Sequence, residues 1–487
     1  MPARFRLRTA KVWPVLALHA LLCLATACGE DPPSSDPSDA SSGDGAGDSD
    51  GAGGSDGAGG SDGGDAGQVD SGADSAPDVA PDAAPDAADA VDAAADVSPS
   101  APPTKLRKPL TTFDPYGLHT VDLTLDSASW QAYLDGVAKG ESKQVYEWHQ
   151  ANVIVNGVAY SDVGIRGFGN GSQIDNPAKP NIRIKFDQFV ATGVGPGKHH
   201  NFRLKASGQD PTFLREPLVY EMVLALGGFA PRFSWAQVRV NGKKYGFYQL
   251  LEQHDARMVK HLMNEKDGAR YETIIGCAGL NCPAAGCAAL KTYYEGGDGK
   301  EIVAAAQVIA SAPQGQLQAQ LAPLLDIDRM LAVYAVDATV SNIDGFAAAG
   351  QNFTFYARET TGQLVILARG ADLTFGNFGA KYDLLTPWGP PNSWCKERQD
   401  ALFGRILAEP ALKTALLAKL RTLQCGPFAQ ANLLQRIQVF ETLLQEHLDA
   451  DPLSIYSKTE VAEQQAELKG YIKARQTALA DLLGPCP

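Results

Sequence analysis

The segment from residue 342 to 376 holds residue types that suit phosphoryl transfer. Asp344 lies in a turn-like Asn-Ile-Asp-Gly sequence, Asn352 opens a strand-like run, and Asp372 opens the sequence Asp-Leu-Thr-Phe-Gly. In phosphoryl-transfer sites one carboxylate orients the acceptor hydroxyl, while an asparagine and a second carboxylate hold the divalent metal that bridges the nucleotide phosphates. The order of the three residues suits that chemistry, although each in isolation is also a common turn or cap residue.

Two predicted elements would position these residues. Residues 326–341 carry apolar side chains at helical spacing, and the helix that they predict ends just before Asp344. Residues 352–358 and 364–369 are apolar, strand-like runs that predict a hairpin. We therefore expect the helix to support the loop of Asp344 and the hairpin to place the two other polar residues beside it.

A second candidate region lies upstream, where the glycine-rich segment Gly164–Ser172 precedes the strand-like run Lys179–Phe186. Apolar residues alternate along that run, which places Asn181, Arg183 and Lys185 together on the opposite face. A glycine-rich loop beside a basic strand face can cradle phosphate, because backbone amides approach closely where no Cβ intervenes. Taken alone, the same pattern also describes a flexible turn and a solvated strand face.

The sequence around this region is mainly β. Alternating polar and apolar residues predict strands at 121–125 and 151–155, and the pairs Asn156-Gly157 and Asn241-Gly242 are strong hairpin turns. Residues 212–226 carry apolar side chains at helical spacing and end before two glycines, which predicts a helix.

A run of strands with one helix, followed by a mostly helical remainder, is the pattern of an α+β protein with two lobes and a cleft between them. We expect a β-rich N-lobe over residues 105–255 and a mainly helical C-lobe over residues 256–487. On the helix of the first lobe, Glu216 and Glu221 can pair with a phosphate-binding Lys or Arg, or can simply face solvent.

The net charge of −14 comes from the N-terminal part of the chain. Residues 29–104 hold seventeen Asp, one Glu and no Lys or Arg, whereas the first 28 residues hold four basic and no acidic residues. The chain from Lys105 onward is neutral, with 38 acidic and 38 basic residues. This balance argues against a nucleic-acid-binding surface on the folded part.

The N-terminus predicts export. Basic residues precede an apolar run from Val12 to Ala27 that is too short to predict a membrane span. The run ends in Leu-Ala-Thr-Ala-Cys28, which resembles the lipobox of bacterial lipoproteins, with Ala25 where a larger aliphatic residue is usual. We expect residues 1–28 to be a lipoprotein-type signal peptide, with Cys28 lipidated and the chain anchored by this lipid alone to a bacterial membrane of the cell envelope, facing periplasm or exterior. An ordinary cleaved signal is the alternative.

Residues 29–104 are predicted to be a disordered tether. They consist largely of Asp, Gly, Ala, Ser and Pro, and repeat the hexapeptide Gly-Ala-Gly-Gly-Ser-Asp at 51–56 and 57–62. With so few large apolar side chains, this segment cannot offset the entropy lost on ordering. A calcium-binding Gly/Asp repeat is the weaker interpretation, because no apolar residue recurs to form a core.

Six cysteines remain after residue 28. An even number in an exported chain favours disulfides, and the sequence leaves their pairing open. Metal binding is the alternative, but the first three are not spaced like paired zinc ligands and no His lies between them. The disulfide candidates are Cys277, Cys282, Cys287, Cys395, Cys425 and Cys486.

Several ordered motifs over residues 120–485 together resemble the CotH family of secreted, atypical protein kinases. They include Gly-Ile-Arg-Gly…Gly-Ser, Lys-x-x-x-Arg-x-Lys-Phe, Val-Asn-Gly…Tyr-Gly-Phe-Tyr-Gln-Leu-Leu-Glu, Asn-Ile-Asp-Gly-Phe, Asn-Phe-Thr-Phe-Tyr, Asp-Leu-Thr-Phe-Gly and Ile-Lys-Ala-Arg. The resemblance implies a divergent bilobal protein-kinase-like fold. It also implies transfer of the γ-phosphoryl group of ATP, with Mg²⁺ or Mn²⁺, to Ser or Thr hydroxyls of an exported acceptor protein that the sequence does not identify.

The resemblance also implies residue roles. Asp344 would be the catalytic carboxylate, and Asn352 and Asp372 would be the metal ligands. Nucleotide or phosphate contacts would come from Gly167, Ser172, Lys179, Arg183, Lys185 and, near the lobe junction, Glu252.

One motif departs from the family. The usual Trp-Asp-x-Asp before Phe-Gly is here Arg369-Gly370-Ala371-Asp372, so only the second Asp is retained. Arg369 could bind phosphate in compensation, or the change could mark a degenerate site. The second hypothesis is therefore a surface protein that uses a kinase-like fold for binding without catalysis.

Overall fold

The computed structural model describes residues 102–138, 146–169, 177–273, 278–282, 285–377, 383–387 and 396–487. The predicted signal peptide with Cys28, the predicted tether up to residue 101, and three further predicted residues, Ser172, Cys277 and Cys395, lie outside these ranges. The described residues form a mixed α and β structure, as predicted. None of their helices is both long and apolar enough to cross a membrane.

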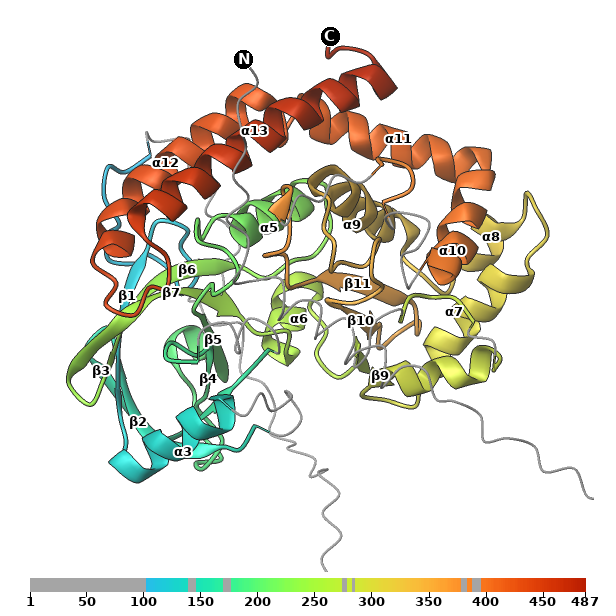
Figure 1. Cartoon of the computed structure of the whole chain (residues 1–487). Helices are drawn as coiled ribbons and strands as arrows, with labels where there is room; N and C mark the ends of the chain where they lie inside the picture. Colours follow the sequence, from blue (N-terminus) through green and yellow to red (C-terminus); the bar gives the residue numbers. More distant parts are fainter. Residues whose placement is uncertain are drawn as a thin grey trace, which may run out of the picture. The chain divides into compact units, whose positions relative to one another are not determined.

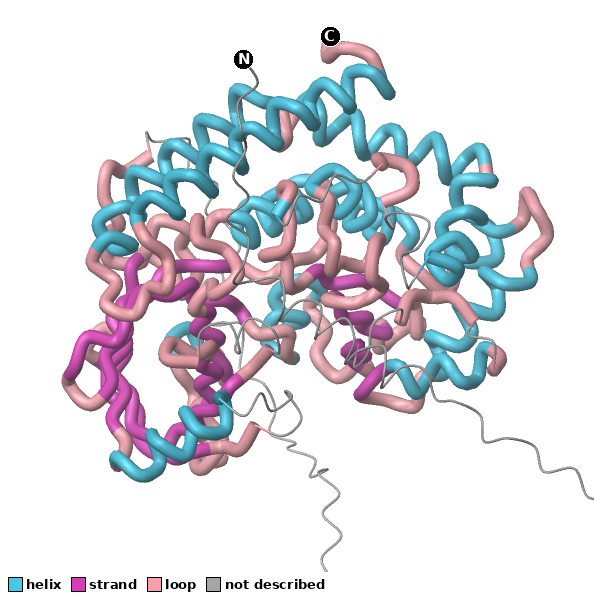
Figure 2. The backbone as a smooth tube through the Cα atoms, viewed as in Figure 1, coloured by secondary structure: helices cyan, strands magenta, loops and turns pink. Residues whose placement is uncertain are grey.

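Seven strands of the described chain close into a barrel in the order β1-β2-β3-β4-β5-β7-β6 (Figures 1 and 2). Neighbours pair antiparallel, except that β6 closes the barrel by pairing in parallel with β1. Asn156-Gly157 and Asn241-Gly242 make the two predicted turns with positive φ at both residues. The strands are β1 (Leu118–Thr124), β2 (His149–Val155), β3 (Val158–Gly167), β4 (Ile182–Lys185), β5 (Asn201–Lys205), β6 (Phe233–Val240) and β7 (Lys243–Glu252).

Alternation along the strands fills the barrel with apolar side chains. Ile165, Ile184, Phe202 and Leu204 belong to the buried cluster inside it, and helix α3 (Ser127–Ala138) adds Tyr133 to the same cluster. Because successive side chains point to opposite faces of a strand, the residues between these apolar positions on β3, β4 and β5 lie on the outer face of the barrel. Those outer positions carry the basic residues of the predicted site.

The first part of the glycine-rich segment is a strand and not a loop. Residues 164–167 are part of β3 and pair with β4 from Gly164 opposite Lys185 to Gly167 opposite Ile182. Gly164 serves packing, since a Cβ there would lie 2.6 Å from Gln188 and 2.9 Å from Trp148. The expectation of a loop beginning at residue 164 is therefore wrong, because small residues fit a crowded strand face as well as a turn.

The chain after the barrel is mainly helical and holds a second, four-stranded sheet in the order β11-β10-β8-β9. Its strands are β8 (Arg270–Thr273), β9 (Tyr294–Glu295), β10 (Phe353–Ala357) and β11 (Leu364–Ala368). Its helices are α6 (Ala256–Met263), α7 (Lys300–Ser311), α8 (Leu317–Leu321), α9 (Ile327–Val340), α10 (Lys396–Ala408), α11 (Pro410–Cys425), α12 (Gln430–Asp449) and α13 (Lys458–Leu483). Short 3₁₀ turns occur at Pro196–Lys198 and Cys287–Tyr293. The predicted helix at 326–341 and hairpin at 352–369 are both confirmed.

One large apolar core joins α5 (Arg215–Ala225), which precedes β6, to the helical part of the chain. It unites side chains of α5 with those of α9, α11, α12 and α13, and with outward-facing residues such as Trp235 and Phe247 of β6 and β7. Helices α12 and α13 run side by side (Figure 1). The buried helix α9 is packed against α5, α11 and β11, so its C-terminal end is firmly placed.

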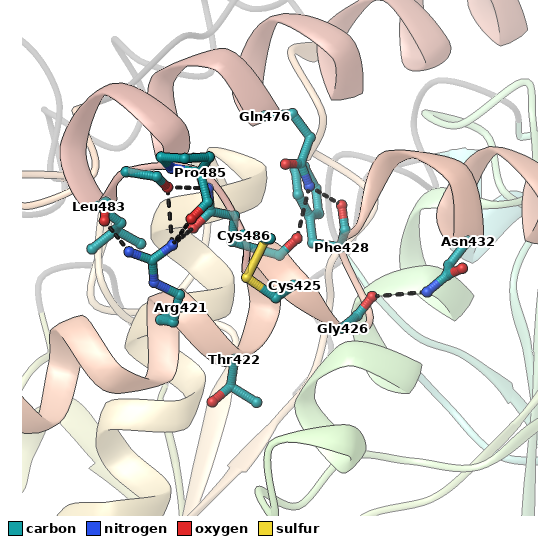
Figure 3. The surroundings of a disulfide bond; sticks show 12 residues. Arg421, Thr422, Cys425, Gly426, Phe428, Asn432, Gln476, Leu483, Pro485 and Cys486 are labelled. Atoms are coloured by element: carbon teal, nitrogen blue, oxygen red, sulfur yellow. Dashed lines mark hydrogen bonds between the residues drawn. A yellow bond between two sulfur atoms is a disulfide. The ribbon is translucent and has the colours of Figure 1, made fainter.

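Two disulfides are present among the described cysteines. Cys425 at the end of α11 bonds to Cys486 beyond α13, and Arg421 donates hydrogen bonds to carbonyl groups of the same C-terminal segment (Figure 3). Cys282 bonds to Cys287. These four residues confirm the disulfide interpretation, and the described residues contain no group of three or more His, Cys, Asp or Glu that could hold a metal ion.

Candidate functional site

The loop of Asp344 follows directly from the C-terminal end of α9. Ser341 ends the helix in a left-handed conformation. The side chain of Asn342 turns back to donate to Asp337 Oδ1 at 2.8 Å, and the other oxygen of Asp337 accepts from the amide of Ala347 at 3.1 Å. Gly345 is required here, because a Cβ would lie 2.4 Å from Asn342 Nδ2. The Asn-Ile-Asp-Gly sequence is therefore a tight, internally bonded turn that presents Asp344.

Asn352 lies against Asp344, as the sequence predicts. Its Nδ2 donates to Asp344 Oδ2 at 2.6 Å and to the Asp344 carbonyl at 3.0 Å. The backbone of Gly370 passes close by with φ +58°, and a Cβ at that position would lie 2.9 Å from the side chain of Asn352. Gly370 thus gives Asn352 the space that it occupies beside Asp344.

Asp372 belongs to a buried three-residue ion cluster with Lys205 and Glu216. Lys205 Nζ lies 2.5 Å from Glu216 Oε2 and 3.1 Å from Asp372 Oδ2. Tyr220, one turn along α5, donates its hydroxyl proton to the second oxygen of Glu216 and accepts from the amide of Gly370 at 3.2 Å. Lys205 at the end of β5 is thereby fixed between α5 and the segment that carries Asp372.

The sequence pointed to Glu216 as a possible partner of a basic residue but missed Lys205. The available signal was alternation: Asn-Phe-Arg-Leu-Lys reads as a strand whose first, third and fifth residues share a face. That pattern does not reveal which residues far along the chain this face meets.

Burial and repulsion between carboxylates shift the pKa values of the residues at this site. Burial raises the pKa of Asp344 to about 7, and repulsion from Asp372 adds to the rise, while Asn352 and Lys205 oppose it. Burial also raises the pKa of Asp372, with Lys205 opposing. For Lys205, the attraction of Asp372 and Glu216 outweighs burial and raises the pKa. Asp344 is therefore able to take up or release a proton near neutral pH, as a general base must.

The side-chain oxygen atoms of Asp344, Asp372 and Asn352 are suitable ligands for a divalent metal that is bound together with phosphates. Mg²⁺ is usually held by one or two carboxylates and completed by substrate phosphates and water. Asp344 and Asp372 repel each other in a buried setting, a cost that a cation would relieve. Asn352 uses its Nδ2 toward Asp344, and among the described residues nothing donates to its Oδ1. These oxygen atoms fit a magnesium or manganese ion.

Hydrogen bonds between the two loops fix the spacing of the site. The amide of Phe375 donates to the Val340 carbonyl at 2.6 Å, and the amide of Ile343 donates to the Leu373 carbonyl at 3.2 Å. Helix α13 contributes Arg475, whose Nε donates to the Thr339 carbonyl at 2.9 Å at the end of α9. The late Ile-Lys-Ala-Arg motif therefore acts as a C-terminal cap on the helix that leads to Asp344.

Arg215 links the same site to α5. Its Nε donates to the Thr374 carbonyl at 3.1 Å, its Nη1 lies 2.6 Å from Asp210 Oδ1, and its Nη2 donates to Gln464 of α13 at 2.9 Å. One buried guanidinium thus joins the barrel side of the structure, the segment after Asp372 and the C-terminal helix.

Lys179 and Glu252 lie in ion pairs of their own. Lys179 Nζ is 2.6 Å from Asp451 Oδ2, and both side chains are 2% exposed. Glu252 at the end of β7 pairs with Arg232, 2.8 Å from its Nη2. The expected contact of Lys179 with phosphate stays a prediction, and its ammonium group is held by a buried carboxylate, as is that of Lys205.

The remaining predicted residues lie on β3 and β4. Arg183 is on the outer face of the barrel and donates to Asn201 Oδ1 at 3.0 Å, and Lys185 lies farther along β4, 4.0 Å from Asp187. Gly167 ends β3. Arg369 pairs with Glu272 of β8 at 2.6 Å.

Comparisons with known proteins agree with the motifs. The sequence model of the family described as CotH kinase protein matches residues 165–479. The inner spore coat protein H of Bacillus subtilis (strain 168) is 27% identical over 217 residues, which cover 42% of this chain. The match spans 57% of that relative's length. Among solved structures, a Shewanella oneidensis MR-1 complex of the toxin–antitoxin proteins HipA and HipB with operator DNA is similar at 14% identity, covering 60% of this chain and 62% of that chain. Its TM-score of 0.29 is too low to support any conclusion.

Proposed function

Because this chain belongs to the CotH kinase family, we propose that it is a protein kinase that transfers the γ-phosphoryl group of ATP to Ser or Thr hydroxyls of an exported protein. The observation that carries the proposal is the meeting of two groups of residues from distant parts of the chain. The Asp344–Asn352 pair and the Lys205–Glu216–Asp372 cluster provide a base, metal-binding oxygens and a fixed cation in one place. These are the parts that phosphoryl transfer requires.

Each residue has a distinct task in this proposal. Asp344 accepts the proton of the acceptor hydroxyl, for which a pKa of about 7 suits it. Lys205, held by Glu216, directs its ammonium group toward phosphate oxygens. Asn352 and Asp372 would hold Mg²⁺ or Mn²⁺, which when bound neutralises charge on the phosphates. The proton leaves the acceptor oxygen as that oxygen bonds to phosphorus, and ADP departs with the electrons of the broken bond.

The proposal includes the arrangement and location expected from the sequence. Residues 105–255 would form the N-lobe and residues 256–487 the C-lobe of a divergent kinase-like fold, with the site between them. The N-terminal 28 residues would direct export and leave Cys28 lipidated, and residues 29–104 would tether the domain to a bacterial membrane. The supporting facts are the composition of those segments and the disulfides of the folded part.

Nucleotide binding tests the proposal. The full chain should melt at a higher temperature in the presence of ATP with Mg²⁺ or Mn²⁺, because ligand binding stabilises the folded state by mass action. Asp372→Ala should lose the metal-dependent part of this shift. A wild-type chain whose melting temperature is unchanged by ATP and either metal would contradict the proposal.

A second candidate function is nucleotide-independent binding of a surface partner. It is favoured by Gly370, which stands where the family usually has a first Asp, and by Arg369, whose guanidinium is engaged by Glu272. Phosphoryl transfer from labelled ATP to a protein hydroxyl decides between the two functions, because only the kinase produces it.

A further inference from the structure

One side chain of helix α13, that of Tyr471, contacts both segments that carry the proposed site. Its hydroxyl lies 2.8 Å from Oγ of Ser341, the residue that ends α9 just before Asp344. Its ring packs on the segment that follows Asp372, where a Cβ on Gly376 would lie 2.7 Å from the ring. Tyr471 therefore helps to set the spacing between the two segments.

Two further residues of α13 contact the same segments. Nε of Arg475 donates to the Thr339 carbonyl at 2.9 Å, at the end of α9. Oε1 of Gln464 accepts from Nη2 of Arg215 at 2.9 Å, and the same guanidinium donates through Nε to the Thr374 carbonyl at 3.1 Å. Helix α13 is thus bonded to the backbone on either side of the proposed catalytic and metal-binding residues.

Helix α13 has little apolar packing of its own for its length. Of its 26 residues six are buried, and Tyr471 and Arg475 are two of these six. The other four are Val461, Leu468, Ile472 and Leu479. A segment opens locally at low cost where few apolar side chains are buried. The support that α13 gives to the site therefore depends on what else holds the helix.

The disulfide between Cys425 and Cys486 holds the C-terminal end of α13 against the end of α11 (Figure 3). Beside it, Arg421 Nη1 and Gln424 Nε2 each donate to the Gly484 carbonyl at 2.9 Å. Helix α11 also packs against α9, which leads to the proposed site. The two cysteines are 61 residues apart, so the bond closes a loop that contains α12 and α13. Closing this loop removes entropy from states in which α13 is detached.

We propose that the Cys425–Cys486 disulfide regulates phosphoryl transfer through Tyr471, which acts as a positioning residue for the loop of Asp344. With the bond formed, α13 is fixed and holds this loop in place. With two free thiols, the helix detaches more readily and the loop loses its support. The inference rests on the proposed function, since it takes Asp344 to be the catalytic carboxylate. The kinase would reach full activity only in an oxidising compartment, where disulfides persist.

The activating step is a thiol–disulfide exchange with a second disulfide, carried by a protein or a small molecule. The thiolate of one cysteine attacks that disulfide and forms a mixed disulfide, and the thiolate of the other cysteine then displaces the partner. Two electrons and the two thiol protons pass to the partner, which ends as two thiols. Reduction by a dithiol reverses the step.

Rates of phosphate transfer from γ-labelled ATP, to the full chain itself and to an added Ser-containing peptide, test the inference. The double variant Cys425→Ser with Cys486→Ser should transfer about tenfold more slowly than wild type, because misplacing a reacting group by a fraction of an ångström has effects of this size. Tyr471→Phe, with the disulfide intact, should lose a similar factor. Combining the three substitutions should add little further loss, since both changes remove the same support.

The second disulfide provides the matched control. Cys282 and Cys287 close a loop of five residues, and Cys282 Sγ lies 3.5 Å from the Ala306 carbonyl of α7. Cys282→Ser with Cys287→Ser should transfer phosphate at close to the wild-type rate. If Cys425→Ser with Cys486→Ser does not fold, this control variant can be folded first, then reduced with dithiothreitol and reoxidised, and its rate should fall and recover.

Amide hydrogen exchange over residues 338–344 separates this inference from the proposed function. These amides should exchange faster when the Cys425–Cys486 bond is absent. Wild-type transfer without the bond, or losses that simply multiply when Tyr471→Phe is added, would overturn the inference and leave the proposed function standing. Faster exchange without the bond, but no transfer by any form of the chain, would support the link between disulfide and site and contradict the proposed function. Unchanged exchange and no transfer would contradict both.

Discussion

Two buried lysines of this protein make ion pairs of different kinds. Lys179 has one carboxylate partner, Asp451, whose oxygens also accept from the amides of Phe247 and Leu453. Lys205 has two carboxylate partners, Glu216 and Asp372. The first group has equal positive and negative charge, whereas the second has one negative charge in excess and lies beside a further carboxylate, that of Asp344.

The titration of the two lysines differs accordingly. Burial lowers the pKa of Lys179 despite its partner, but the two carboxylates outweigh burial at Lys205 and raise its pKa. A balanced buried pair joins the barrel to the loop after α12 and serves the fold. The group with one negative charge in excess is the one at the proposed site.

Replacing each lysine by methionine should have the largest effects, and the two replacements should affect different properties. Lys205→Met should reduce phosphoryl transfer by roughly two to three powers of ten, because one fixed charge on the transferring group is lost. Lys179→Met should instead lower the free energy of unfolding by about 3 to 5 kcal/mol, since Asp451 would be left buried and unpaired. The measurements are labelled-phosphate transfer at low temperature and denaturant unfolding. Equal losses of transfer in the two variants, both folded, would contradict the distinction.

The pH dependence of stability should reveal the buried carboxyl of Asp344 beside the second group. The pKa of Asp344 is raised from 3.8 to about 7 in the folded protein, so its ionisation opposes folding progressively more as pH rises between these values and by a constant amount above 7. Asp344→Asn removes that cost. The variant should therefore be more stable than wild type, with a gain about 2 to 3 kcal/mol larger at pH 8 than at pH 5. Urea unfolding at the two pH values measures it, and a gain independent of pH would contradict the assigned burial of this carboxyl.

The smallest effect is expected for a substitution at Gly370. Its φ of +58° and the closeness of Asn352 make any side chain unfavourable, so Gly370→Ala should lower the free energy of unfolding by about 1 to 3 kcal/mol. The rate of phosphoryl transfer should also fall, because Asn352 would be displaced from Asp344. Gly362→Ala, at φ +69° with only a distant contact, is the control that carries the backbone strain alone. If Gly370→Ala and Gly362→Ala reduce the rate of transfer by the same small amount, Gly370 has no role in positioning Asn352.

The sequence predicted those parts of the molecule that depend on neighbours along the chain. Asn-Gly pairs located both hairpin turns, and helical spacing located α9 with its end before Asp344. The pairing of Asp344 with Asn352 also followed, because a short loop and one hairpin bring them together.

The parts that sequence could not predict depend on contacts between distant residues. The resemblance placed Lys179 at the site, and nothing near it in the sequence indicated its partner Asp451, which follows α12. Lys205 belongs to no motif that the sequence analysis recognised, and its place at the proposed site becomes visible only where it meets Glu216 and Asp372. The charge balance that distinguishes the two lysines exists only in the folded protein.

The proposed role of Asp344 is tested by comparing wild type with Asp344→Asn for transfer of phosphate from γ-labelled ATP, with nucleotide affinity measured in parallel. If Asp344 positions the acceptor hydroxyl and takes its proton, the variant should bind ATP with Mg²⁺ or Mn²⁺ much as wild type does. It should transfer phosphate more slowly by roughly two to four powers of ten. Transfer at the wild-type rate by the folded variant, or no transfer by wild type to itself or to any exported protein offered, would contradict the account.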